Sequence, residues 1–289
     1  MKLTALALAL VSAAALTATT PARPDRARPP CCATSAAPAP AVAARTVPHA
    51  PVEPCSAPLS PVSQAAAEPK EEPLPPAPKS DPMSKHIEAP NLKGVIMEVR
   101  PDKTRRVMIA TEVCLREGPL EVFLCKKGTK EHEAILRSDV DAQKLHELLL
   151  LTGAEAGKPT QFIDAKTETP AYKPATGTKM KVSVHYTKDG KTHTHAAQEW
   201  VWDLKKKAPM PHGWVFAGSM IITDPDNGKK FYGANSGDII SISNFPFSML
   251  EIPVEISKDE AQLTYEAKTE KIPAIGSKVW LILEPTPAF

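Results

Sequence analysis

The sequence predicts an α+β protein that is mostly β, with antiparallel sheets and hairpins and one main helix near residues 139–152. Beyond about residue 91, short segments of alternating apolar and polar residues are bounded by Gly, Asp and Pro, as strands and turns are. Segments with strand periodicity outnumber those with helical periodicity several to one. The connections between them are short, which favours antiparallel pairing.

An apolar leader opens the chain. Lys2 is followed by an uncharged run from Leu3 to Leu16 that is rich in Leu and Ala. A run of about 14 apolar residues fits the hydrophobic region of a secretory signal peptide, whereas a membrane-spanning helix needs about 20. We therefore expect residues 1–22 to be a signal peptide, the mature protein to be periplasmic or secreted, and no transmembrane segment to remain after cleavage.

Residues 23–90 are expected to form a Pro/Ala-rich disordered tether. Residues 21–90 carry more than half of the 31 prolines and few aromatic or β-branched side chains that could offset the entropy of ordering the backbone. Three of the five cysteines, Cys31, Cys32 and Cys55, lie in this segment. Because exported proteins can keep disulfides, a disulfide-linked dimer through the tether cysteines is possible.

Residues 91–289 are expected to form one globular domain, since about 200 residues suffice to bury a core. Four strands are expected in its first part: Val95–Val99, Val107–Leu115, Leu120–Cys125 and His132–Leu136. The turn residues 116–119 predict that the second and third strands form a hairpin. In that register Cys114 and Cys125 lie about 13 Å apart along the pair, too far for a disulfide.

The helix near residues 139–152 is predicted from its ends and its period. Ser138 and Asp141 make a start that resembles a capping box, and Gly153 stands where a left-handed C-cap belongs.

The second half of the domain is predicted to consist of β-strands. Asp189-Gly190 predicts a hairpin between Lys179–Tyr186 and Thr192–Trp202, with Tyr186 opposite His193 and Val184 opposite His195. Further strands are expected at Trp214–Thr223, Lys229–Tyr232, Ile239–Ser243, Leu263–Ala267 and Lys278–Leu283.

Several of these segments together resemble one family. They are residues 112–121, running on through Cys125 to 128–136, and the later segments 213–219, 237–240 and 243–246. They resemble the YdjY-domain family of exported bacterial proteins, in its planctomycete-type form, over nearly all of residues 91–285. The resemblance implies export but no assigned activity. A ferredoxin-like role is disfavoured, because the domain holds only Cys114 and Cys125 and neither a C-x₂-C nor a C-x₄-C pair.

The candidate binding residues are His132, Glu133, Trp200 and Trp202. His132-Glu133 begins like a zincin motif, but Leu136 stands where the second His would be, so the motif is excluded. Both residues stay candidates because they lie in the family segment 128–136. Trp200 and Trp202 would share one strand face, which suits either core packing or a ligand platform.

No metal site, cofactor or catalytic residue is expected. His193 and His195 are spaced as two ligands on one strand face, but the predicted hairpin supplies no third ligand. The net charge of +2 is too small to indicate nucleic-acid binding. We expect an exported, tethered, non-catalytic domain that binds an unidentified envelope protein or cell-wall component. The alternative is an extracytoplasmic enzyme with a site around His132 and Cys125.

Overall fold

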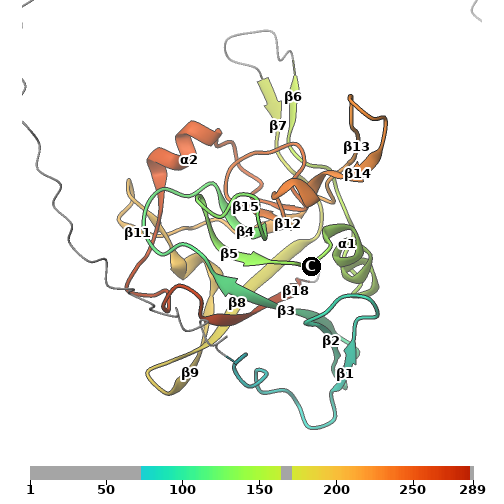
Figure 1. Cartoon of the computed structure of the whole chain (residues 1–289), viewed down its shortest axis with the longest axis vertical. Helices are drawn as coiled ribbons and strands as arrows, with labels where there is room; N and C mark the ends of the chain where they lie inside the picture. Colours follow the sequence, from blue (N-terminus) through green and yellow to red (C-terminus); the bar gives the residue numbers. More distant parts are fainter. Residues whose placement is uncertain (1–72, 164–170, 287–289) are drawn as a thin grey trace, which may run out of the picture. The chain divides into compact units, whose positions relative to one another are not determined.

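Eight strands close into a β-barrel, which is the centre of the fold (Figure 1). The computed structural model describes residues 73–163 and 171–286. Around the barrel the order is β3 (Arg105–Val113), β18 (Lys278–Pro285), β8 (Lys179–Lys188), β12 (Trp214–Phe216), β16 (Leu250–Glu251), β15 (Ile240–Ser241), β4 (Val122–Lys126) and β5 (Ala134–Ser138). Pairing of β5 with β3 closes the ring. The pairs β4–β5 and β15–β16 are parallel and the others are antiparallel.

The barrel closes because β3 changes partner along its length. Residues 105–109 of β3 pair with β2 (Val95–Val99), whereas Glu112 and Val113 pair with β5. On its other edge β3 pairs with β18 over Val107–Glu112. Side chains alternate along these strands, so Ile109 and Leu281 enter the main core while Met108 and Trp280 form a second cluster on the outer face.

The remaining strands extend or cap the barrel. Strand β1 (Lys85–Glu88) pairs with β2, and β9 (Lys191–Ala196) pairs with β8. Three small sheets complete the described β-structure: β10 (Val201–Asp203) with β11 (Ala208–Pro209) and β17 (Tyr265–Ala267), β6 (Gln161–Ile163) with β7 (Ala171–Lys173), and β13 (Ile221–Thr223) with β14 (Lys230–Tyr232). The last two are hairpins that project at the top of Figure 1.

Two α-helices and two 3₁₀ helices complete the described structure: α1 (Ala142–Leu151), α2 (Lys258–Thr264), Ala197–Trp200 and Gly233–Ser236. Helix α1 is the predicted main helix. The Asp141 carboxylate accepts hydrogen bonds from the backbone N–H groups of Gln143 and Lys144, and Gly153 follows with φ of 90°. The mostly-β fold class with this helix is therefore confirmed.

The hairpin around Asp189-Gly190 has the predicted register, with Tyr186 opposite His193 and Val184 opposite His195. The predicted hairpin between β3 and β4 is wrong. Strand β5 lies between them, antiparallel to β3 and parallel to β4, because it offers a buried apolar strand to both edges. Leu263 lies in a helix instead of a strand, since Ser257 caps α2 by accepting from the Glu260 N–H.

The expected tether overlaps the folded region. Strand β1 lies within residues 23–90, so the described fold begins before the boundary expected at residue 91. The expected signal peptide, residues 1–22, lies outside the described residues, as does the tether up to residue 72. Among the described helices, none has the length and apolar character needed to cross a bilayer.

Candidate functional site

A pocket of about 420 Å³ opens where β3 changes partner from β2 to β5. We call it the Arg137 pocket. Its charged lining residues are Lys93, Glu112, Lys127, Arg137, Asp139 and Lys278. Pro73 and Leu74, the first described residues, also line it. Segments far apart in the sequence thus meet at one opening of the barrel wall.

The opening follows from the local backbone. Gly94 accepts a hydrogen bond from the Ala110 N–H at 2.7 Å, and a Cβ on Gly94 would lie 2.9 Å from that of Ala110. Only glycine allows this close approach, which fixes the loop before β2 against β3. On the other side, the Ser138 hydroxyl donates to the Ala110 carbonyl at 3.1 Å. The pocket is therefore bounded by fixed backbone on both sides.

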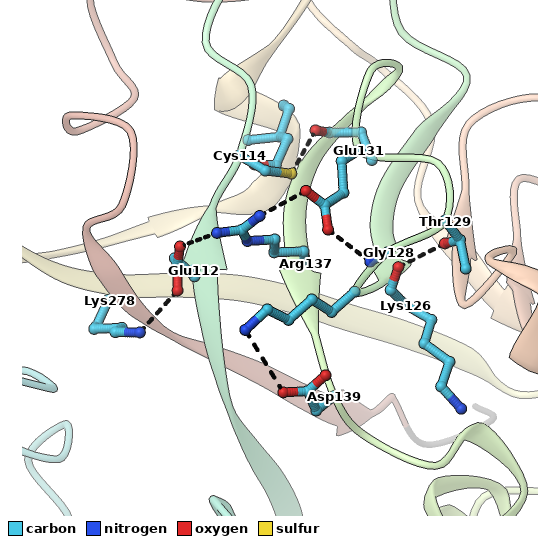
Figure 2. Close-up of polar contacts among 12 residues, drawn as sticks. Glu112, Cys114, Lys126, Gly128, Thr129, Glu131, Arg137, Asp139 and Lys278 are labelled. Atoms are coloured by element: carbon cyan, nitrogen blue, oxygen red, sulfur yellow. Dashed lines mark hydrogen bonds and ion pairs between the residues drawn. The ribbon is translucent and has the colours of Figure 1, made fainter. Parts of the chain in front are cut away.

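Arg137 is the centre of an ion-pair network (Figure 2). Its guanidinium donates to the Glu112 carboxylate and, at 2.6 Å, to Glu131. Glu112 also pairs with the Lys278 ammonium at 2.8 Å, and Glu131 accepts from the Gly128 N–H at 2.7 Å. Each carboxylate thus holds Arg137 while being held by a second donor, so the guanidinium has a fixed position.

These contacts keep the network ionised. Burial opposes ionisation of Glu112, but hydrogen bonds from Lys278 and Arg137 outweigh that effect and hold the pKa of Glu112 below its ordinary value. The hydrogen bond to Glu112 raises the pKa of Arg137. The Gly128 N–H lowers the pKa of Glu131. Glu112, Glu131 and Arg137 therefore stay charged near neutral pH.

The pocket lining has an excess of positive charge. Lys93, Lys127, Arg137 and Lys278 face two lining carboxylates, Glu112 and Asp139. The outermost pair is loose, since the Lys127 ammonium is 4.0 Å from Asp139 and both side chains are more than half exposed. An exposed pair of this kind contributes little to stability. Lys127 and the exposed Lys93 can therefore turn to an anionic ligand at little cost.

Two cysteines lie next to this network. Cys125 is fully buried, and its thiol forms a hydrogen bond with that of Cys114, which also contacts the Ala134 carbonyl at 3.1 Å. The Cys114 thiol lowers the pKa of Cys125, and the same contact together with burial raises the pKa of Cys114. Both thiols are free.

His132 is not part of this arrangement. Its side chain is 78% exposed and its Nε2 lies 3.7 Å from Glu133. Glu133 is nearly buried and pairs with Lys130 at 3.4 Å. The Cys125 thiol is hydrogen-bonded to Cys114, Thr129 and the Lys130 backbone, and the side chain packs with Val122 and Ala134. The structure therefore places the two residues of the possible enzyme site in different settings, a shielded thiol and a solvated imidazole.

The other predicted residues also separate. Trp200 ends a 3₁₀ helix and is fully buried against Phe123 and Tyr186, so it is a core side chain. Trp202, in β10, is half-buried with the Lys268 ammonium 3.9 Å from its ring centre. The two indoles do not share a strand face, because the strand begins only at Val201.

The paired histidines of β9 stack on aromatic neighbours. The rings of His193 and His195 are 6.0 Å apart and both lie against Tyr186, while His195 contacts Glu199 at 3.1 Å. Within residues 73–163 and 171–286, no group of three or more His, Cys, Asp or Glu side chains could hold a metal.

Sequence reasoning missed the Arg137 pocket. Glu112, Arg137 and Lys278 lie on three different strands and are brought together by the fold. In the sequence, each is indistinguishable from an ordinary charged surface residue. One weak indication existed, since Glu112 and Glu131 both lie in the segments that carry the family resemblance.

The chain was compared with known proteins at three levels. No curated protein and no solved structure gives a significant match. The family model described as the YdjY domain matches residues 100–284, which is more than half of the chain. The match begins shortly before β3 and ends within β18, so it includes all eight strands of the barrel. The chain therefore belongs to the YdjY domain family.

Proposed function

We propose that this protein is an exported, tethered, non-catalytic domain that binds an envelope protein or cell-wall component, and that the Arg137 pocket holds an anionic group of that ligand. The observation that carries the proposal is the excess of positively charged side chains in the pocket lining. Arg137 is held by two carboxylates, and Lys93 and Lys127 stand at an opening of about 420 Å³.

The state of the charges favours binding over catalysis. A general acid or base works best when its pKa is near the working pH. Here the pKa of Glu112 is held below its ordinary value and that of Arg137 above it, so neither exchanges a proton near neutral pH. Such permanent charges suit recognition of a carboxylate or phosphate.

The alternative of an extracytoplasmic enzyme around His132 and Cys125 has one supporting observation, the lowered pKa of the Cys125 thiol. A lowered pKa favours the reactive thiolate. The burial of that side chain counts against the alternative, because a substrate needs access to the sulfur.

The test is retention on purified cell-wall sacculi and on immobilised envelope extract. The wild-type chain is compared with Lys93→Glu/Lys127→Glu, which reverses the two exposed pocket charges. The matched control is Lys191→Glu/Lys230→Glu, which changes the net charge equally on β9 and β14, away from the pocket lining. We expect retention that falls with added salt and is lost only in the pocket variant.

Two results would contradict the proposal. Equal retention of the pocket and control variants would show that the pocket does not contribute. Turnover of an ester, peptide or glycan substrate that disappears in Cys125→Ala would favour the enzyme instead.

A further inference from the structure

A proline-rich segment lies on the outer face of the barrel. Residues 74–78 read Leu-Pro-Pro-Ala-Pro. Proline holds its own φ near −65° and also restricts the preceding residue to extended conformations, so nearly every residue of this segment is biased toward a polyproline II helix. That helix has three residues per turn. In agreement, Pro75 and Pro78 are buried while Pro76 and Ala77 are exposed.

The surface under this segment is apolar and aromatic. Met108 of β3, Trp280 and Ile282 of β18, and the partly buried Ile96 of β2 form a cluster separate from the barrel core. Leu281 and Leu283 enter the core, so Trp280 and Ile282 point outward from the same strand. Trp280 is nevertheless only 6% exposed. The proline segment supplies cover for an indole that the barrel itself leaves on the outside.

Two side chains of the barrel contact consecutive backbone carbonyls of the segment. The Trp280 Nε1–H donates to the Pro75 carbonyl at 2.9 Å, and the His185 Nε2 lies 3.1 Å from the Pro76 carbonyl. His185 Nδ1 contacts the Thr194 hydroxyl at 2.7 Å, an arrangement in which Nδ1 accepts and Nε2–H donates. Trp280 and His185 are directly opposite each other on β18 and β8. Two neighbouring strands thus present donors to a backbone whose carbonyls have no partner within a polyproline II helix.

We propose that this face is a binding site for Pro-x-x-Pro segments in the polyproline II conformation, occupied by the chain's own residues 75–78 and able to accept the same sequence supplied in trans. An aromatic groove with an indole donor is how polyproline ligands are commonly held. The two buried prolines, one period apart, face the barrel, and the contacts of the indole and the imidazole with consecutive carbonyls fix the register.

The occupant in cis has an advantage. Residues 79–84 join the segment to β1, which is itself fixed in the sheet. A short linker of this kind gives an effective concentration in the millimolar range. A separate peptide must compete with residues 75–78 of the same chain, so it should bind weakly to the wild-type protein. It should bind more tightly to a variant in which residues 75–78 have lost affinity for the face.

The experiment uses a fluorescent peptide of residues 71–80 and the full chain, followed by fluorescence anisotropy. In Pro75→Ser/Pro78→Ser the segment in cis loses the two buried rings, and we expect the peptide to bind at least tenfold more tightly than to wild type. Adding Trp280→Phe, which keeps an aromatic ring but removes the N–H, should weaken that binding at least fivefold. Trp202→Phe in the same background is the matched control and should leave it unchanged.

A control peptide with the same two Pro→Ser changes should not bind. Equal binding of both peptides, or no binding to a Pro75→Ser/Pro78→Ser chain whose circular dichroism is native, would overturn the proposal. A second measurement needs no variant. In the wild-type chain the Trp280 indole N–H should be protected from hydrogen exchange, and exchange at the rate of a free indole would refute the site.

Discussion

Replacing Trp200 with Ala should destabilise the protein severely, because the structure makes this indole a core side chain. Trp200 is fully buried between Phe123 and Tyr186, with ring centres 6.4 and 5.2 Å away. An aromatic side chain buries about 150–250 Å², which corresponds to about 4–6 kcal/mol at about 25 cal/mol per Å². Measured losses for Trp→Ala in cores are about 3–5 kcal/mol, which we take as the expected loss in the free energy of unfolding.

Trp202 is the matched comparison, since it lies two residues away and is half-buried. Its main specific contact is with the Lys268 ammonium, and an exposed cation–π contact contributes about 0.5–1 kcal/mol. Trp202→Ala should therefore cost about 1–2 kcal/mol in all, well below the cost at Trp200.

The assay is urea unfolding followed by far-ultraviolet circular dichroism, with the slope of the transition compared between variants. At about 2–4 °C per kcal/mol for a domain of this size, Trp200→Ala should also lower Tm by roughly 6–20 °C. If Trp200→Ala lost less than about 1 kcal/mol, or Trp202→Ala lost as much as Trp200→Ala, the core assignment would be refuted.

Three further predictions concern other parts of the fold. Cys114 and Cys125 should remain reduced when the folded protein is treated with oxidised glutathione, because Cys125 is fully buried and the oxidant cannot reach its sulfur; a cross-linked peptide under non-reducing conditions would contradict this. The pKa of Glu112 is lowered on folding, so its contribution to stability is present above about pH 4.5 and lost as the pH falls through the folded-state pKa; acid titration of unfolding should show a weaker pH dependence in Glu112→Gln, and an unchanged dependence would argue against the network. Gly177 has φ of 131° and a Cβ there would lie 2.0 Å from the Phe216 carbonyl oxygen, so Gly177→Ala should cost roughly 3 kcal/mol or more, whereas Gly190→Ala, with open space around it, should cost about 1–2 kcal/mol in the same urea assay.

The parts of the fold that were predictable are those set by local chemistry. Asp189-Gly190 supplies the two left-handed residues of a tight turn, and the register of β8 and β9 follows from that turn alone. Helix α1 begins at a side chain that caps its own first turn. In both cases the residues that decide the structure are neighbours in sequence, so one sequence is enough.

The parts that failed depend on distant segments. Strand β3 ends at Val113 and the chain bends at Gly118, but a bend does not specify which strand pairs with β3, and β5 occupies that edge instead of β4. Which of two neighbouring strands pairs with β3 is decided by burial, to which the barrel as a whole contributes. The Arg137 pocket was unpredictable for the same reason, since Glu112 and Lys278 are 166 residues apart.

The proline segment connects the two proposed sites. Pro73 and Leu74 line the Arg137 pocket, and the next residue, Pro75, accepts the hydrogen bond from Trp280. If the segment leaves the outer face, these two residues no longer have a fixed place in the pocket wall. A ligand that contacts Leu74 must then bind more weakly, and by reciprocity that ligand must hold the segment in place. We therefore expect Pro75→Ser/Pro78→Ser to reduce retention on envelope material while leaving Lys93 and Lys127 unchanged, and the bound ligand to slow hydrogen exchange at the Trp280 indole. Unchanged retention of the Pro75→Ser/Pro78→Ser chain, with no change in that exchange when the ligand binds, would show that the two sites are adjacent but energetically independent.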